Sequence, residues 1–367
     1  MEFQIERETL LRPLQSIIGV VERRQTLPIL ANVLIEKTPE QLCLTATDLE
    51  VELKTQTPLE GGDTGQVTVP ARKLMDIVRN LPGDAILNLR QEADRIVIKA
   101  GPSRFSLATL PAEDFPTADD IEPTHRFPLP QAQLRWLIEK THFAMAVQDV
   151  RYYLNGLLFE LEPQQLRAVA TDGHRLALAG LRAAEEWGEA TQVIIPRKGV
   201  QEMLRLLDGD DETPVEVDLG AGHIQVNLDG IRFTSKLIDG RFPDYPRVIP
   251  EETGNYAVVD RETLRKALVR ASILSNEKYR GVRLGFEPDQ LRIQSNNPEQ
   301  EEAEEQVPAT FNGEALEIGF NASYMLDALS VIDEKTVHLH VRDANSSALI
   351  IGETIRDARY VVMPMRL

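Results

Sequence analysis

The feature that most constrains this fold is an internal repeat with a period close to 125 residues. A three-residue element recurs as Ala46-Thr47-Asp48, Ala170-Thr171-Asp172 and Ser295-Asn296-Asn297, at spacings of 124 and 125 residues. Each repeat also divides in two, because a strand, a helical segment and several further strands occur twice within it. Six similar halves in one chain indicate an array or a ring of units rather than one large core.

The predicted elements follow the same order in every repeat. Each repeat opens with a short strand whose first apolar residue is aromatic, namely Phe3, Phe127 or Tyr256. Helical periodicity is predicted over residues 8–24, 71–81, 131–146, 197–207, 261–274 and 321–332. Pro13 weakens the first of these helices unless it lies in the first turn. We expect an α+β chain of three similar domains, each with two helices packed on antiparallel sheets, over residues 1–122, 127–246 and 255–367.

Composition limits the class of protein and its compartment. The 367 residues include 42% apolar residues, enough for ordinary globular cores, and no run is long enough to span a membrane. The first residues lack a basic region followed by an apolar stretch, so no secretion signal is expected. Cys43 is the only cysteine, which excludes an intramolecular disulfide and a cysteine-based zinc cluster. The expected compartment is the cytoplasm.

The distribution of charge answers an objection raised by the net charge. A net charge of −18 argues against binding nucleic acid, because phosphate contacts depend on Lys and Arg. The six helical segments, however, hold fifteen Lys or Arg and seven Asp or Glu, which gives them +8 and leaves −26 on the rest of the chain. If the helices share one surface, that surface is basic and suited to sequence-independent phosphate contacts. The last helix, with Asp327 and no basic residue, departs from this pattern.

Several longer motifs resemble one known family. They run from the second repeat to the last residue, and together with the repeat pattern the resemblance covers the whole chain. The motifs are Asp149 to Gly156, Thr171 to Leu176, Asp239 to Tyr245, Leu274 to Lys278, Asn296 to Glu302 and Tyr360 to Leu367. They closely resemble the bacterial DNA polymerase III beta subunit, the DNA sliding clamp.

The resemblance implies a DNA clamp fold and a head-to-tail homodimeric ring. Helices would line the hole, strands would form the outer wall, and the ring would hold a polymerase on duplex DNA without being an enzyme. The implied partners are duplex DNA, the polymerase III catalytic subunit, a clamp loader, and other polymerases and repair proteins that carry linear peptide motifs. No cofactor or metal is expected. There is no phosphate-loop motif for ATP, so ring opening would need an external ATP-driven loader.

Candidate DNA contacts are basic residues of the helices together with three residues of the loop that the family also uses. They are Arg24, Arg72, Arg79, Gln148, Tyr152, Tyr153, Arg197, Lys198 and Arg205. The two tyrosines are equally well explained as core residues with a satisfied hydroxyl.

The resemblance also places the ring-closing contact between the first domain of one subunit and the third domain of the other. Its implied residues are Lys73, Arg104, Phe105, Leu107, Ile273, Leu274, Glu299, Glu301, Glu302, Glu304 and Glu305. The acidic run has a second explanation as a charged edge strand that prevents aggregation, and both roles can hold together.

A pocket for client peptides is implied between the second and third domains. Its implied lining is Arg151, Tyr153, Leu154, Thr171, Gly173, His174, Arg175, Leu176, Pro243, Arg247, Val248, Ser347, Val361, Val362, Met363, Pro364, Met365, Arg366 and Leu367. The chain end is apolar and carries two Met, a residue type that adapts to varied partners. Val361 and Val362 are equally consistent with a last core strand.

Two alternatives of a different kind remain. Asp172 and His174 could serve a hydrolase as an acid–base pair, although a turn at Asp172-Gly173 explains them better. The chain could also be a scaffold that binds peptides without encircling DNA. A clamp predicts no chemical turnover, loss of peptide binding when the pocket is changed, and retention on closed circular DNA.

Overall fold

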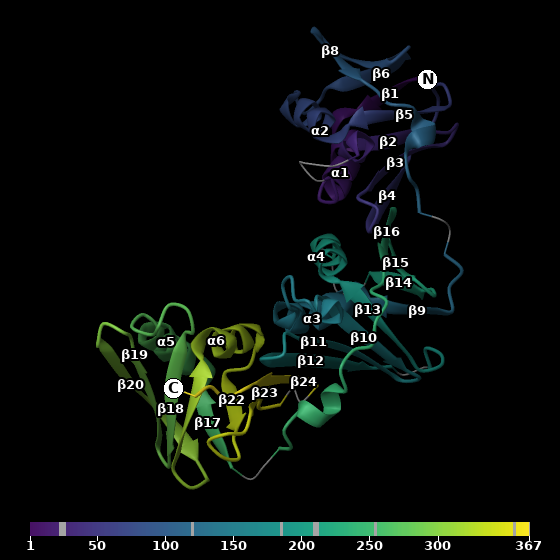
Figure 1. The fold of residues 1–367 in the computed structure, drawn as a ribbon. Helices are drawn as coiled ribbons and strands as arrows, with labels where there is room; N and C mark the ends of the chain where they lie inside the picture. Colours follow the sequence, from purple (N-terminus) through teal and green to yellow (C-terminus); the bar gives the residue numbers. More distant parts are fainter. Residues whose placement is uncertain are drawn as a thin grey trace. The chain divides into compact units, whose positions relative to one another are not determined.

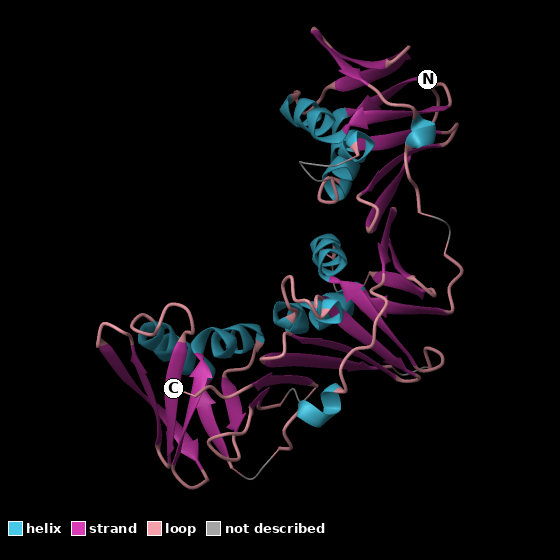
Figure 2. Cartoon of the chain, in the orientation of Figure 1, coloured by secondary structure: helices cyan, strands magenta, loops and turns pink. Residues whose placement is uncertain are grey.

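The computed structural model describes residues 1–21, 27–118, 121–183, 186–207, 213–252, 255–354 and 357–366. Within these residues it contains six α-helices and twenty-four strands, which follow one another as six copies of strand, helix and three strands (Figure 1). The six halves predicted from the repeat are therefore confirmed as secondary structure, as is the α+β class (Figure 2).

The bounds of the elements show how regular the halves are. The first repeat contains β1 (Glu2–Glu6), α1 (Arg7–Ile17), β2 (Asn32–Lys37), β3 (Gln41–Thr47), β4 (Val51–Pro58), β5 (Gly65–Pro70), α2 (Ala71–Asn80), β6 (Ile86–Glu92), β7 (Arg95–Ala100) and β8 (Ser103–Ala108). The second contains β9 (His125–Pro130), α3 (Gln131–Thr141), β10 (Gly156–Glu162), β11 (Gln165–Thr171), β12 (Arg175–Arg182), β13 (Thr191–Pro196), α4 (Arg197–Leu206), β14 (Pro214–Leu219), β15 (His223–Leu228) and β16 (Ile231–Lys236). The third contains β17 (Tyr256–Asp260), α5 (Arg261–Ser272), β18 (Gly281–Glu287), β19 (Gln290–Asn296), β20 (Glu302–Phe311), β21 (Leu316–Asn321), α6 (Ala322–Val331), β22 (Thr336–His340), β23 (Ala348–Gly352) and β24 (Ala358–Val362).

The first strand of each half joins the three later strands of the other half of the same repeat. Thus β1 pairs with β6, and β5 pairs with β2; the second and third repeats follow the same rule. Each repeat is interlocked in this way, because neither half completes a sheet by itself. All of these pairings are antiparallel.

Sheets also continue from one repeat to the next. Strand β4 pairs with β16 in an eight-stranded sheet, and β12 pairs with β24 in a twelve-stranded sheet. As a result the chain divides into two compact units, residues 1–132 with 198–237 and residues 133–197 with 238–367. The dividing line passes through the second repeat, since its two groups of four strands belong to sheets shared with different neighbouring repeats.

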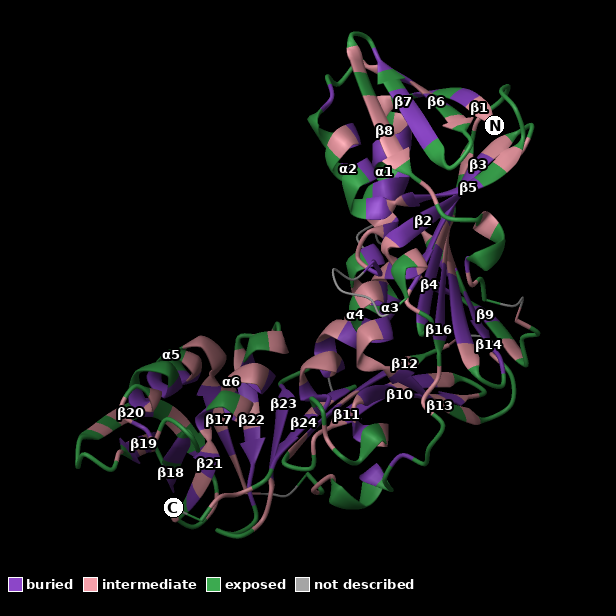
Figure 3. Cartoon of the chain, turned by 45° about the horizontal axis from the view of Figure 1, so that its top comes forward, coloured by how far each residue is buried: buried purple, intermediate pink, exposed green. Residues whose placement is uncertain are grey.

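The helices cover sheets through apolar faces within each unit. In α1 the buried residues include Leu10, Leu14 and Ile17, at the helical spacing expected within residues 8–24. Figure 3 shows burial concentrated in the strands and on the helix faces that meet them. The helices end earlier than predicted in several places, for example α1 at Ile17. Pro13 lies inside α1 and is buried, not in the first turn, so the helix accepts the loss of one backbone donor there.

In the part of the chain that the structure describes, no helix is both long enough and apolar enough to cross a membrane.

Candidate functional site

An apolar pocket of about 190 Å³ opens in the unit formed by residues 133–197 and 238–367. We call it the apolar pocket. Most of the residues implied for the peptide site lie around it. Its lining is Arg151, Leu154, Thr171, Gly173, Arg175, Leu176, Pro243, Asp244, Tyr245, Val248, Ser347, Val361 and Met363.

The floor of the apolar pocket is made where two repeats share a sheet. Leu176 of β12 lies directly opposite Val361 of β24, so the two side chains stand on the same face. Both belong to a buried cluster with Leu154 and Tyr245. The floor is therefore rigid core on which a partner's apolar side chain could be buried, at roughly 25 cal/mol per Å² of apolar surface.

A tight turn between β11 and β12 forms one wall. The Thr171 hydroxyl donates to the carbonyl oxygen of Arg175 at 2.6 Å and accepts from the backbone N–H of Gly173 at 3.1 Å. The Asp172 carboxylate accepts from the backbone N–H groups of His174 and Arg175. Gly173 adopts a φ of +88°, a left-handed conformation that glycine tolerates best.

This turn does not have the geometry of an acid–base pair. The Asp172 carboxylate bonds to backbone N–H groups and to the guanidinium of Arg175 at 3.1 Å. The imidazole of His174 instead stacks on Tyr324, with ring centroids 6.3 Å apart. Asp172 thus shapes the turn, as the sequence predicted for Asp172-Gly173.

Arg151 borders the pocket and is fixed by Asp149. Its guanidinium donates two hydrogen bonds to the Asp149 carboxylate, at 3.0 and 2.8 Å, and a third to the Asp172 carbonyl at 3.3 Å. The side-chain hydrogen bonds from Arg151 lower the pKa of Asp149 to about 2. Arg151 therefore presents a fixed cation at the rim across the ordinary pH range.

Arg175 connects the pocket to helix α6. Its guanidinium forms ion pairs with Asp172 and with Asp327 of α6. It also donates to the carbonyl of Phe143 at 2.9 Å and lies over the ring of Tyr324, 4.6 Å from its centroid. This explains the acidic residue that sets α6 apart in sequence, because Asp327 neutralises a largely buried arginine.

Several residues implied for the pocket lie away from its lining. Tyr153, His174, Val362, Pro364, Met365 and Arg366 are not among the lining residues. Val362 is buried opposite Arg175 and Ala348 in the sheet, and the Met365 backbone N–H donates to Gly319. Arg247 lines a neighbouring hollow that shares Val248 and Ser347 with the apolar pocket. Leu367 lies outside the described residues.

Two lining residues were not predicted, although both belong to a motif that carried the resemblance. Asp244 and Tyr245 follow Pro243 in the segment Asp239 to Tyr245. Tyr245 is buried, and its hydroxyl donates to the Glu160 carboxylate. An aromatic residue directly after a Pro-Asp turn was the available signal for a packed position.

The basic residues predicted for DNA differ in how free their charges are. Arg205 donates to the carbonyl oxygens of Gln15 and Ser16 and pairs with Glu202. Lys198 pairs with Asp48, and Arg72 and Arg197 each bond to a backbone carbonyl. Arg79 is exposed, and its guanidinium bonds to no other residue in the described ranges. Arg24 lies outside the described residues.

The loop before β10 presents the other three candidate DNA contacts. Gln148 is exposed with a φ of +55°, and Tyr152 is 56% exposed. Tyr153 is half-buried and packs against the cluster that forms the pocket floor. The two tyrosine rings meet edge to face at 5.8 Å. Tyr152 is therefore available to a partner, whereas Tyr153 mainly supports the fold.

The residues implied for ring closure lie on sheet edges and helix ends. Phe105 and Leu107 are half-buried on β8, the last strand of its sheet, and Arg104 and Lys73 are exposed. Ile273 is 71% exposed after α5, and Leu274 is half-buried. Of the acidic run, Glu299, Glu301, Glu302 and Glu304 are exposed, whereas Glu305 is already paired with Arg270 at 2.6 Å.

Comparison with known proteins decides the family. The N-terminal, central and C-terminal domain descriptions of the DNA polymerase III beta subunit match residues 1–119, 128–244 and 246–366. The chain belongs to the DNA polymerase III beta subunit family. The resemblance seen in the motifs is thereby confirmed, and the DNA clamp fold with it.

Relatives match over their full lengths. The chain is 54% identical to the beta sliding clamp of Pseudomonas putida KT2440 and 49% identical to that of Escherichia coli K12, each over 100% of both chains. A crystal structure of the DNA polymerase III subunit beta from Pseudomonas aeruginosa, 53% identical, superposes with a TM-score of 0.98 over 100% of both chains. Another structure from that organism shows a sliding clamp bound to griselimycin, with a TM-score of 0.96.

Proposed function

We propose that this protein is a sliding clamp: a homodimeric ring that encircles duplex DNA and tethers polymerases through the apolar pocket. Membership of the beta subunit family supports the function. The proposal of a ring is supported mainly by the way in which the last strands of the six halves pair. We further propose three domains, over residues 1–122, 127–246 and 255–367, and action in the cytoplasm, where chromosomal DNA is reached.

The last strand of each half follows one pairing rule, which among the described strands leaves the last strands of two halves without another last strand as partner. The last strands of halves one and four pair, as β4 with β16, and those of halves three and six pair, as β12 with β24. Halves two and five remain, ending in β8 and β20. Strand β8 pairs only with β7, and Glu302 to Pro308 of β20 pair only with β19 among the described strands. The same rule would join β8 of one subunit to β20 of another, and two such junctions close a dimer.

The two internal junctions also give a register for this contact. Phe233 of β16 lies opposite Leu53, which in turn lies opposite Ala46. Phe105 matches Phe233 in the repeated Arg-Phe pair, and Ser295 matches Ala46 in the recurring triplet.

Strand β20 supplies the partner position. Ala303 lies opposite Ser295, so Phe105 of one subunit would lie opposite Ala303 of the other. The neighbouring pair would then be Arg104 and Glu304, opposite charges at directly facing positions. Charge complementarity supports this register, because like charges facing each other would be destabilising.

Sliding requires contacts with DNA that are weak and independent of sequence. The helices carry the basic residues, whereas the chain as a whole is strongly acidic. Exposed cations such as Arg79 would contact phosphates, and Tyr152 and Gln148 would add contacts from the adjoining loop. Topology, rather than tight binding, would keep the protein on DNA.

Client proteins would bind in the apolar pocket with a short extended peptide. The flat apolar floor of Leu176 and Val361 suits aliphatic or aromatic side chains, and exposed Met363 suits varied partners. We propose the polymerase III catalytic subunit, other polymerases and repair proteins as clients, and a clamp loader as the protein that opens the ring. We propose the role of a processivity factor rather than a hydrolase. The two residues of the hydrolase alternative have structural roles, because Asp172 shapes a turn and His174 stacks on Tyr324.

The deciding experiment is topological. The protein is loaded on nicked circular DNA, exposed to high salt, and separated by gel filtration before and after the circle is cut. A ring stays with the circle at high salt and is lost after linearisation. Equal loss from circular and linear DNA would contradict the ring and favour the peptide-binding scaffold.

A further inference from the structure

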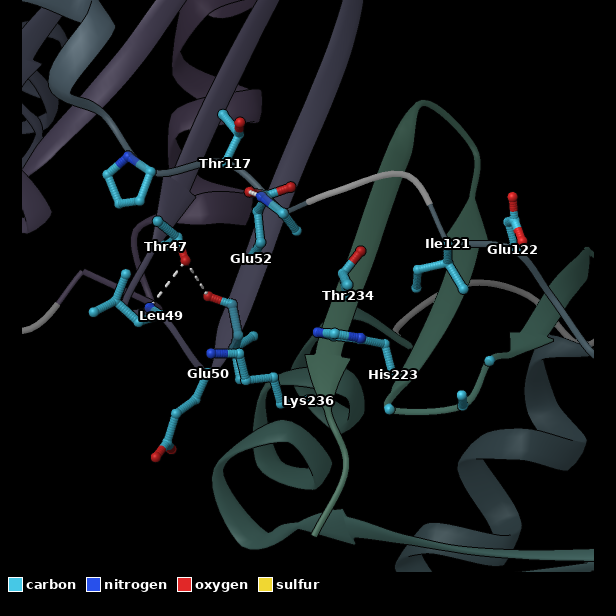
Figure 4. Close-up of a pocket in the computed structure, with 16 residues that line it drawn as sticks. Thr47, Leu49, Glu50, Glu52, Thr117, Ile121, Glu122, His223, Thr234 and Lys236 are labelled. Carbon is cyan, nitrogen blue, oxygen red and sulfur yellow. Dashed lines mark hydrogen bonds between the residues drawn. The ribbon is translucent and has the colours of Figure 1, made fainter. Parts of the chain in front are cut away.

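A second and larger cavity, of about 520 Å³, lies in the other unit (Figure 4). We call it the polar pocket. It is lined from three places: the turn between β3 and β4 with the start of β4, the described linker residues 116–118 and 121–122, and the strands β15 and β16 with the turn before β15. Its lining is Thr47, Leu49, Glu50, Val51, Glu52, Pro116, Thr117, Ala118, Ile121, Glu122, Gly220, Ala221, Gly222, His223, Thr234 and Lys236.

The polar pocket occupies the same place in the repeat as the apolar pocket. The Thr47 hydroxyl donates to the Val51 carbonyl at 3.0 Å and accepts from the Leu49 N–H at 3.1 Å, as Thr171 does in the second repeat (Figure 4). Leu49 has a φ of +79°, matching Gly173 at +88°. Each pocket also has a proline that follows a buried phenylalanine, Pro116 here.

The floors of the two pockets have the same geometry but opposite chemistry. In the polar pocket Glu52 of β4 lies directly opposite Thr234 of β16. The apolar pocket has Leu176 opposite Val361 at the matching positions. The polar pair is as buried as the apolar one, since Glu52 is 8% exposed and Thr234 is 4% exposed. A carboxylate and a hydroxyl therefore stand in the polar pocket where the apolar pocket has two aliphatic side chains.

The Glu52 carboxylate is poorly compensated for its burial. One oxygen accepts from the backbone N–H of Ala118 at 2.7 Å, the single hydrogen bond that the described residues give it. Burial raises its pKa, against the smaller effects of Lys54 and Arg232. A carboxylate removed from water is stabilised most by a cationic donor, which forms stronger hydrogen bonds than a neutral one.

The remaining lining adds acidic charge at the rim and apolar surface on the walls. Glu50 and Glu122 are exposed at the rim, and Lys236 is the one lysine or arginine among the described lining residues. Leu49 and Ile121 supply apolar surface beside the charged floor. A cavity of this volume is within the range of known ligand sites. The combination fits a ligand that is cationic at one point and apolar on either side.

We propose that the polar pocket binds an extended peptide segment of a partner protein through one lysine or arginine side chain, whose cation meets Glu52 and Thr234. The inference that the ligand is a peptide rests on the proposed function of the apolar pocket. The inference that the ligand is cationic depends on the buried carboxylate of Glu52. One subunit would then offer two inter-repeat pockets of opposite selectivity, one for apolar and one for basic segments.

The test uses the full-length protein with methyl-labelled Ile, Leu and Val and a tripeptide, acetyl-Leu-Lys-Leu-amide. The Ile121 methyl reports the polar pocket, and the Leu176 and Val361 methyls report the apolar pocket in the same spectrum. We expect saturable shifts at Ile121. The analogue with norleucine in place of lysine has the same chain length without the ammonium, and we expect it to bind at Ile121 at least about tenfold more weakly.

Two variants test whether the lysine of the peptide contacts the Glu52 carboxylate. Glu52→Gln keeps the acceptor for Ala118 but removes the charge, and we expect it to weaken the lysine peptide about tenfold at Ile121. Glu60→Gln removes the same charge from an exposed position outside the pocket lining and should leave binding within about twofold. Unchanged methyl shifts elsewhere in both variants check that the fold is intact.

Three outcomes would contradict the binding of a cation at Glu52. They are equal binding of the norleucine peptide at Ile121, unchanged binding in Glu52→Gln, or no shift at Ile121 at millimolar peptide. If n-butylamine binds as tightly as the tripeptide, the pocket is a site for small amines and the peptide assignment is wrong. The proposed client site is judged separately, because an apolar peptide that fails to move Leu176 and Val361 would contradict that function without touching Ile121.

Discussion

At the residue scale, single positions decide whether the pocket turn forms. The turns at Leu49 and Gly173 share hydrogen bonds and a positive φ, so the backbone geometry does not require glycine in both. The two turns differ in the side chain that packs against them. A Cβ on Gly173 would approach the Arg151 guanidinium to 3.0 Å. A Cβ at this position would have to displace the Arg151 guanidinium, which the Asp149 carboxylate holds.

We therefore expect Gly173→Ala to lower the free energy of unfolding by about 1 kcal/mol, from strain at positive φ and displacement of Arg151. Urea denaturation measures this change. Gly83→Ala is the control, because a Cβ there meets no atom within 4 Å and its effect should stay within about 0.5 kcal/mol. Equal losses in both variants would contradict this account of the turn.

The Asp149 carboxylate gives a pH prediction. Its folded pKa is lowered from 3.8 to about 2, mainly by hydrogen bonds from Arg151. Because the folded value is the lower one, the stabilisation is fully present above pH 3.8 and is lost as the pH falls through about 2. The carboxyl carbon shift of Asp149 should stay constant down to pH 3. In Arg151→Gln its midpoint should rise toward 3.8, and an unmoved midpoint would contradict the assigned cause.

The basic residues of the helices should separate into two groups. Arg79→Ala should weaken DNA binding and reduce its salt dependence by about one unit of slope per lost phosphate contact, with little effect on stability. Arg205→Ala should cost about 1 kcal/mol of stability, because Arg205 holds the carbonyls of Gln15 and Ser16. Salt-dependent DNA binding and urea denaturation of both variants distinguish the groups. Identical profiles would contradict this division.

At the scale of elements, helix α6 supports the wall of the apolar pocket. It contributes Asp327 and Tyr324 to the surroundings of Arg175, which lies in the pocket wall. Arg175 is also held by Asp172 of the turn. One guanidinium thus fixes the turn, the helix and the wall of the pocket in relation to one another.

Asp327→Ala should lower stability by about 1–2 kcal/mol, because it removes one of the two carboxylates that neutralise a mostly buried arginine. The apolar client peptide should also bind several-fold more weakly, since Arg175 lines the pocket. Glu277→Ala, an exposed acidic position after α5, is the control for the lost charge. Fluorescence anisotropy with a labelled peptide and urea denaturation give both quantities, and an unchanged peptide affinity would show that Arg175 keeps its place without Asp327.

At the scale of the whole molecule, the pairing rule leaves two last strands of the single chain, β8 and part of β20, without the partner that the other described last strands have. Among the described strands, β8 and Glu302 to Pro308 of β20 each keep one unpaired side. Phe105 and Leu107 lie on β8, and the exposed Ile273 follows α5, which packs against β20. Burying one such side chain is worth about 1.5–3 kcal/mol. A few of these residues, with paired backbone, would hold the proposed junction between two subunits.

The proposed register predicts a charge-reversal pair. Arg104→Glu should place like charges opposite each other at each junction and shift the protein from dimer toward monomer of 41.2 kDa, raising the dimer dissociation constant at least tenfold. Adding Glu304→Arg should restore most of the affinity. Sedimentation equilibrium measures both. Arg90→Glu, on the same sheet but away from the edge, should leave the dimer intact, and failure of the double variant to recover would contradict the register.

The repeat could be recognised in the sequence because it consists of local sequence patterns that recur several times along the chain. Aromatic strand starts, recurring triplets and helical stripes each follow from contacts between near neighbours, and the six halves appeared where they were expected. The helix ends were less accurate. In α3 the periodicity continues past Thr141, but the chain there leaves the α-helix for a short 3-10 turn at His142–Ala144.

What the sequence by itself determined is the number of halves, the basic helices, and the motifs that place the chain in its family. The tertiary structure alone decided which strand pairs with the last strand of each half. It therefore decided which last strands keep an unpaired side. It also showed that Asp327 serves Arg175, and that Glu52 and Thr234 occupy the positions of Leu176 and Val361. These facts depend on pairings between residues more than a hundred positions apart, and local propensity carries no information about such pairings because backbone hydrogen bonding is the same for every partner strand.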